Sequence, residues 1–155
     1  MAERRPKSHE HEVAYDSILV VLENGVYSEE AIRTAVKLAT RRSRGIHVLV
    51  TITVPAKAEI DADLPAAESK AATTIERARV FGGRRVTGHA VKLRAGEAGR
   101  RVVEEAREIN ARAIVFPLRP DIAGSLFSPA VQRVLSDRPC RVILTTESKR
   151  TAATL

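Results

Sequence analysis

Residues 17–25 read SILVVLENG, and the segment SEEAIRTAVKLATRRS follows at residues 28–43. The first stretch is a continuous apolar run of strand length that ends in turn-forming residues, which is typical of a strand buried on both faces. The second begins with Ser28, a favoured N-cap, has Glu29 and Glu30 in its first turn, and repeats apolar residues at helical spacing. Gly45 stands where such a helix can end. A buried strand followed by an amphipathic helix is the first part of a β-α-β unit.

The same alternation continues along the chain. Further strands are predicted over residues 46–54, 86–93, 113–116 and 140–146, and further helices over 65–80, 97–110 and 129–137. Pro65 opens one of these helices, and Gly82 with Gly83 closes it. This order predicts right-handed crossovers and an α/β fold, namely a doubly wound five-stranded parallel sheet with helices on both faces.

The length of 155 residues fits one domain, which we place at residues 15–147 between flexible tails at 1–14 and 148–155. A single cysteine, Cys140, excludes an internal disulfide, and we expect it to be a small buried hydrophobe. No apolar run reaches the length of a membrane span, and the first residues lack the apolar core of a signal peptide. The cytoplasm is therefore the expected location, without membrane insertion.

The formal net charge of +7 could attract nucleic acid. The basic residues are dispersed, however, and only 3% of the residues are aromatic, so few rings are available to stack on bases. A solvated cationic surface is the favoured interpretation. His9 and His11 form an H-x-H pair without further ligands in view, so no metal site is predicted. His47 and His89 fall within predicted strands and are expected on sheet surfaces.

These segments together resemble the universal stress protein family over residues 15–146. The resemblance rests on the opening strand SILVVLENG, the helix with EEAIRTAVKLA, the approach AGEAGRRVVEEA, the strand with IVF, and above all VQRVLSDRPCRVIL. It implies a strand order of 3-2-1-4-5, a homodimer, and in many members ATP bound at the carboxyl ends of strands 1 and 4. The loop FPLRPDIAGSLFSP is similar to a form attached to amino-acid permeases, which suggests a transporter or a stress-pathway protein as a partner.

The rule for open α/β sheets independently places a ligand crevice where the strand order reverses, between strands 1 and 4. The candidate residues lie at the end of the first strand, in the second strand and in the segment after the fourth strand. They are Glu23, Asn24, Gly25, Thr51, Pro117, Arg119, Gly124, Ser125 and Ser128.

The crevice departs from the pattern of the ATP-binding members. Glu23 stands where those members resemble one another in an aspartate, and Pro117 stands at the first glycine of their phosphate loop. Ser128 and Pro129 replace the terminal Gly-Ser or Gly-Thr, so the loop loses backbone N–H donors that would approach phosphate. Arg119 and the hydroxyl of Ser128 remain, together with the flexible backbone at 124–125. We therefore predict no bound cofactor, or weak binding of ATP or AMP.

The favoured function is a universal stress protein-like regulatory module with a degenerate nucleotide crevice, acting through protein contacts and through a homodimer at Val142, Ile143 and Leu144. No Ser/His/Asp or Cys/His set falls at the strand ends, so an enzyme is not expected. Two alternatives stay open: an ATP- or AMP-binding stress-response switch, and a basic nucleic-acid-binding protein.

Overall fold

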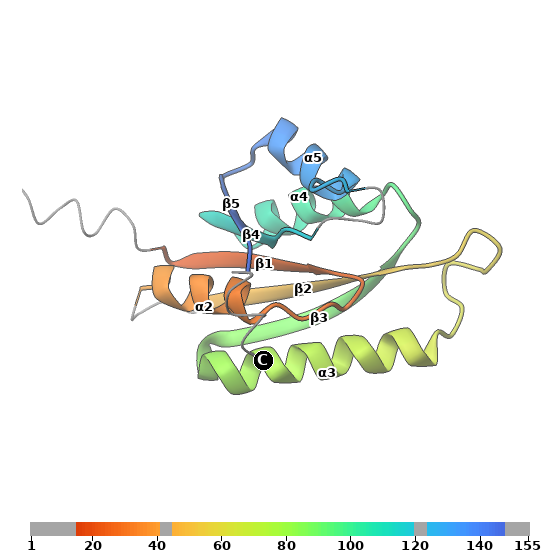
Figure 1. Ribbon diagram of the computed structural model, residues 1–155, viewed down its shortest axis with the longest axis horizontal. Coiled ribbons are helices and arrows are strands. Elements are labelled where there is room, and N and C mark those ends of the chain that lie inside the picture. Colours follow the sequence, from red (N-terminus) through yellow and green to blue (C-terminus); the bar gives the residue numbers. More distant parts are fainter. Residues whose placement is uncertain (1–14, 41–44, 120–123, 148–155) are drawn as a thin grey trace, which may run out of the picture.

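The computed structural model describes residues 15–40, 45–119 and 124–147 (Figure 1). The strands in these ranges are β1 (Ser17–Glu23), β2 (Gly45–Thr53), β3 (Val86–Leu93), β4 (Ala113–Pro117) and β5 (Arg141–Thr145). The helices are α2 (Glu29–Leu38), α3 (Pro65–Gly82), α4 (Ala98–Glu108) and α5 (Pro129–Asp137), with a short 3₁₀ turn at Gly83–Arg85. The predicted flexible tails at 1–14 and 148–155, including His9 and His11, lie outside the described residues.

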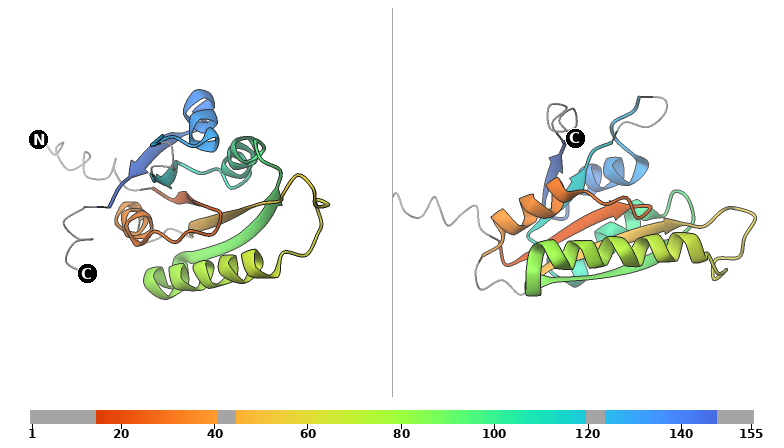
Figure 2. Two further views of the ribbon diagram at one scale, coloured as in Figure 1. Left: turned by 45° about the vertical axis from the view of Figure 1, so that its right-hand side comes forward. Right: turned by 60° about the horizontal axis from the view of Figure 1, so that its bottom comes forward.

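The strands form one parallel sheet in the order β3-β2-β1-β4-β5, which confirms the predicted fold class and topology. Helices α2 and α3 cover one face of this sheet, and α4 and α5 cover the other (Figures 1 and 2). The order reverses between β1 and β4, since β1 connects onward through α2 to β2 on one side while β4 leads through α5 to β5 on the other.

The central strand β1 supplies both halves of the core. Ile18, Val20 and Leu22 pack under α2 and α3, whereas Leu19 and Val21 pack under α4 and α5, and all five are fully buried. Successive side chains of a strand point to opposite faces, so a strand that is covered on both faces has no polar position in its interior. This explains why residues 18–22 are an unbroken apolar run.

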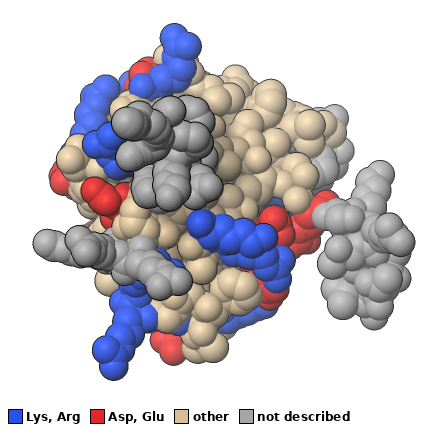
Figure 3. Space-filling view, turned by 90° about the vertical axis from the view of Figure 1, so that its left-hand side faces the viewer, with Lys and Arg blue, Asp and Glu red and all other residues tan. Residues whose placement is uncertain are grey.

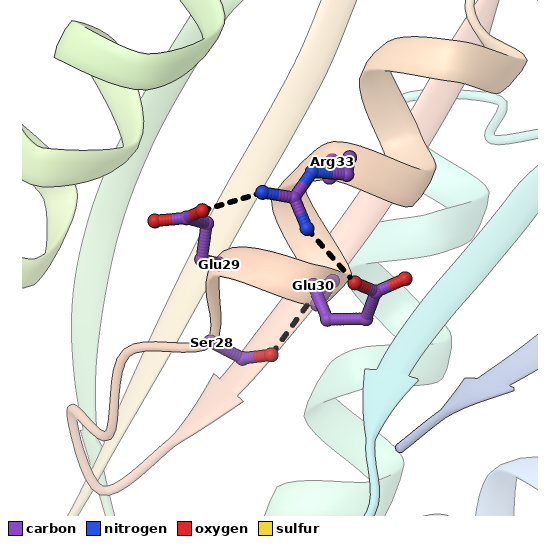
Figure 4. Close-up of polar contacts among 5 residues, drawn as sticks. Ser28, Glu29, Glu30 and Arg33 are labelled. Atoms are coloured by element: carbon purple, nitrogen blue, oxygen red, sulfur yellow. Dashed lines mark hydrogen bonds and ion pairs between the residues drawn. The ribbon is translucent and has the colours of Figure 1, made fainter. Parts of the chain in front are cut away.

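Helix α2 begins as predicted. The Ser28 hydroxyl accepts a hydrogen bond from the Ala31 N–H at 3.1 Å, and Arg33 bonds to Glu29 at 2.6 Å and to Glu30 at 3.1 Å (Figure 4). These contacts satisfy an N–H group of the first turn and place negative charge at the positive end of the helix dipole.

The predicted end of α2 at Gly45 is wrong. The last helical residue is Leu38, whose carbonyl accepts a hydrogen bond from the Tyr15 N–H at 2.8 Å, and the Thr40 N–H bonds to the Tyr15 carbonyl at 3.0 Å. Pairing with the segment before β1 draws the backbone out of the helix. Gly45 is instead the first residue of β2, where an added Cβ would lie 2.5 Å from the His47 ring.

Candidate functional site

The turn after β1 is held in place by its neighbours. Asn24 and Gly25 adopt left-handed backbone conformations, with φ of 55° and 73°. The Asn24 N–H donates to the Thr51 hydroxyl at 3.3 Å, and the Thr53 N–H donates to the Asn24 side-chain oxygen at 3.2 Å. The Thr74 hydroxyl of α3 donates to the Gly25 carbonyl at 2.6 Å. The turn is thus fixed to β2 and to α3 at the point where the strand order reverses.

A cavity of about 250 Å³ lies between this turn and the loop after β4. Five of the predicted site residues line it: Glu23, Asn24, Pro117, Arg119 and Ser128. Its wall also includes Val26, Leu126 and Val131. The structure therefore brings residues from the turn after β1, the end of β4 and the start of α5 to one place.

The other four predicted site residues do not line this cavity. Thr51 is 3% exposed, and its hydroxyl is used to hold the Asn24 N–H. Gly25 is buried against α3, where an added Cβ would lie 3.3 Å from Lys70 Cγ. Gly124 and Ser125 are exposed, and the Ser125 hydroxyl donates to the Phe127 carbonyl at 3.4 Å. Thr51 and Gly25 are thus positioning residues for the turn.

A hydrogen bond spans the cavity. The Ser128 hydroxyl donates to Glu23 Oε2 at 2.7 Å and accepts from the Val131 N–H at 3.2 Å, the latter as the predicted N-cap of α5. Burial raises the pKa of the Glu23 carboxyl, and the hydrogen bond from Ser128 opposes this in part. Because Ser128 is engaged with both Glu23 and α5, neither its proton nor one of its lone pairs is free for a ligand.

Arg119 is the basic residue in the cavity wall. It is exposed, and its Nη2 donates a long hydrogen bond of 3.5 Å to the Tyr27 carbonyl, the one hydrogen bond that its guanidinium makes to the described residues. Pro117 and Pro129 stand on either side of the loop and have no N–H. Among the described residues that line this cavity, Arg119 is therefore the one positive group available to an anion.

A second cavity of about 280 Å³ adjoins the first and shares Pro117, Arg119 and Leu126 with it. Its remaining wall is formed by Ser28, Leu118 and the end of β5 with the following residues, Thr145, Thr146 and Glu147. Thr145 is 8% exposed, and its hydroxyl has no hydrogen-bond partner among the described residues. The sequence analysis missed this part of the site, although the parallel topology places the carboxyl end of β5 at the same edge.

Several other sequence predictions concern residues outside the crevice. Cys140 is half-buried, and burial raises the pKa of its thiol, which disfavours the reactive thiolate. His47 Nδ1 lies 3.3 Å from the Thr87 hydroxyl across neighbouring strands, and His89 Nε2 lies 3.7 Å from the Glu105 carboxylate. Both histidines are on the sheet, as expected.

Within the described ranges, no cluster of three or more His, Cys, Asp or Glu side chains could hold a metal ion. A search of the helices in the same residues finds none that is long and apolar enough to span a membrane.

The protein is of the doubly wound α/β class, with an open parallel sheet. Its cavity lies where the strand order reverses, which is the position at which proteins of this class bind ligands. The model of the universal stress protein family matches residues 14–146, and the chain belongs to this family. The resemblance to the permease-attached form stays a prediction. No curated protein matches the chain.

Two solved structures show the same fold. A universal stress protein from Archaeoglobus fulgidus is 21% identical, with 88% of this chain and 97% of that chain covered and a TM-score of 0.56. A universal stress protein in complex with cAMP is 22% identical, with 87% of this chain and 99% of that chain covered and a TM-score of 0.58. At sequence identities of 21% and 22%, these two comparisons establish a shared fold only.

Proposed function

We propose that this chain is a regulatory module whose ancestral nucleotide crevice is closed by its own side chains, so that it acts through dimerisation and protein contacts. The observation that carries the proposal is the 2.7 Å hydrogen bond between Ser128 and Glu23, which joins the two walls of the crevice. A nucleotide entering between these walls must break this bond or bind beside it.

The energetic argument favours weak nucleotide binding. A charge-assisted hydrogen bond contributes about 1.5–3 kcal/mol, so losing two or three phosphate contacts weakens a complex by orders of magnitude. Pro117 and Pro129 remove backbone donors, and the buried Glu23 carboxylate repels phosphate when ionised.

A second candidate is a switch that binds AMP or a cyclic nucleotide. The solved universal stress protein in complex with cAMP favours it, because that protein shares the fold. A single phosphate needs fewer donors than a triphosphate, and the guanidinium of Arg119 in the cavity wall carries several N–H groups. In this alternative the crevice still binds a nucleotide with a single phosphate but no longer binds ATP.

Nucleic-acid binding receives less support. Lys and Arg side chains on the face shown in Figure 3 are separated by acidic and uncharged residues. Eight of the basic residues of the chain lie outside the described residues, namely Arg4, Arg5, Lys7, Arg41, Arg42, Arg44, Lys149 and Arg150. Within the part of the chain that the structure describes, the basic residues on this face do not form a continuous track for a phosphate backbone.

Calorimetric titration of the full chain with ATP, AMP and cAMP, with and without magnesium, tests the proposal. We expect dissociation constants of about 1 mM or weaker. Ser128→Ala should bind AMP about tenfold more tightly than the wild type, because it removes the hydrogen bond that a nucleotide entering the crevice has to break. Ser136→Ala is the control, since it removes a hydroxyl at an exposed position of the same helix α5 that lines neither cavity. Micromolar binding of ATP by the wild type would overturn the proposal.

A further inference from the structure

Helix α3 has a second face beside the one that it buries. Its buried residues are Ala71, Thr74, Ile75 and Ala78. The residues at the neighbouring helical positions, Thr73, Glu76, Arg77, Val80 and Phe81, line a hollow of about 430 Å³ next to the start of α2. Tyr27 and Glu29 form the opposite wall. This hollow is larger than either crevice cavity and shares no lining residue with them.

Part of the wall of the hollow is apolar and aromatic, formed by Val80, Phe81 and Tyr27. Val80 is 77% exposed and Phe81 is 41% exposed, which is unusual for large hydrophobic side chains on a helix that packs against a sheet. Tyr27, in the segment before α2, lines the same hollow. Desolvating this surface favours an apolar group in the hollow.

The charges around the hollow leave one cation without a partner. Glu29 is paired with Arg33 at 2.6 Å, and Glu76 lies 3.8 Å from Arg79. Arg77 has no carboxylate within ion-pair distance among the described residues. Its guanidinium carbon instead lies 4.0 Å from the centre of the Tyr27 ring.

Stacking fixes the guanidinium but does not use its N–H groups. An arginine that lies flat on an aromatic ring keeps the donors on its edge free, and these match the two oxygens of a carboxylate. Since both acidic residues of the wall already have arginine partners, the charge left for a ligand to complement is positive. The hollow therefore favours an anion with an apolar body.

We propose that this hollow is a binding site for a small carboxylic acid with an aromatic or branched aliphatic body. The carboxylate pairs with Arg77, and the body lies on Val80, Phe81 and the Tyr27 ring. A volume of about 430 Å³ is within the ~300–1,000 Å³ range of small-molecule sites. The site is independent of the nucleotide crevice and of whether that crevice holds a ligand.

The test is an NMR titration of the ¹⁵N-labelled full chain with 4-phenylbutyrate, with 4-phenylbutanol as the uncharged analogue. We expect saturable shifts at the residues of α3 that line the hollow, with a dissociation constant of about 1 mM or below. Arg77→Gln should weaken phenylbutyrate binding about tenfold and leave phenylbutanol binding unchanged. Lys70→Gln is the control on the same helix, since it removes a positive charge at an exposed position that does not line the hollow, and it should bind as the wild type does.

Three outcomes would overturn the proposal. Equal binding of phenylbutyrate by Arg77→Gln and the wild type would show that Arg77 does not recognise the carboxylate. Shifts confined to the crevice would place the ligand elsewhere. Shifts at the hollow that follow protein concentration without any ligand would assign this face to a second copy of the chain. Thermal unfolding of each variant, followed by circular dichroism, checks that the variants are folded.

Discussion

Ser28 and Ser128 show how one residue type gains a second role from its surroundings. Each hydroxyl caps a helix by accepting a backbone hydrogen bond, at 3.1 Å from Ala31 and at 3.2 Å from Val131. Only Ser128 also donates to a carboxylate, that of Glu23. Ser28 therefore only caps its helix, whereas Ser128 also joins the two walls of the crevice, because Glu23 at the end of β1 lies within hydrogen-bond distance of it.

Burial of Glu23 makes the stability of the fold depend on pH. The pKa of its carboxyl is raised above the ordinary value of 4.5, so the folded state holds the proton more tightly than the unfolded state. The stability that Glu23 contributes is full below the ordinary value and is lost as the pH rises through the raised one. Glu23→Gln, which cannot ionise, should be more stable than the wild type at neutral pH and lose this advantage near 4.5.

Urea unfolding across this pH range measures the effect. Glu104→Gln, which changes an exposed glutamate of α4, is the control and should leave the profile of the wild type nearly unchanged. Parallel profiles for Glu23→Gln and the wild type would contradict the role given to burial.

At the scale of elements, the turn after β1 depends on α3. Thr74 is 4% exposed, and its hydroxyl donates to the Gly25 carbonyl at 2.6 Å. Thr74→Val keeps the shape of the side chain but leaves this carbonyl unpaired in the interior, which costs about 1–3 kcal/mol of the free energy of unfolding. Thr73→Val at the exposed neighbouring position should cost less than about 0.5 kcal/mol. Chemical denaturation of both variants compares them, and equal losses would refute the assignment.

The packing of α4 on α5 depends on a glycine. An added Cβ at Gly99 would lie 2.5 Å from Arg133 Cβ and 3.4 Å from Ala130 Cα, so the helices must separate to admit it. Gly99→Ala gains helix propensity of about 1 kcal/mol, but overpacking costs about 1–3 kcal/mol, and we expect a net loss of stability. Arg100→Ala changes the next, exposed residue and serves as the control. A rise in the thermal midpoint of Gly99→Ala would show that the contact is loose.

The elements themselves were predictable because their signals are local. The strand at Val86–Leu93 and the helix at Pro129–Asp137 have the predicted bounds, since apolar runs, prolines and glycines mark them directly. The end of α2 was not predictable in this way, because it depends on pairing with Tyr15, which is distant in sequence.

The same distinction holds for the site. Glu23 is the last residue of β1 and Ser128 directly precedes α5, and both carry polar side chains. The sequence therefore identified both as candidate site residues. Their hydrogen bond joins residues that are 105 positions apart, which no local pattern contains. Leu126 and Val131 line the cavity without any chemical mark in the sequence, and Thr145 joins the site only because parallel strands end at a common edge.

At the scale of the whole molecule, Tyr27 lies between the two candidate ligand sites. Its carbonyl faces Arg119 of the crevice, and its ring lies under Arg77 in the hollow beside α3. The edge strand β5 is on the other flank of the sheet, where it pairs with β4. The proposed protein contacts of the module therefore use a surface separate from the hollow.

The proposed dimer through β5 gives the last prediction. Val142, Ile143 and Leu144 are half-buried in a strand that pairs on one side within the described chain, so a second copy would cover both its apolar side chains and its open backbone edge. In a two-fold interface each substitution occurs twice, and Ile143→Lys would bring two charges together. We expect light scattering to give a dimer for the wild type and a monomer for Ile143→Lys, with folding checked by circular dichroism. Ile60→Lys places the same charge on a 46% exposed side chain in the connection between β2 and α3 and should remain dimeric. A monomeric wild type, or a dimer that survives Ile143→Lys, would exclude β5 as the interface.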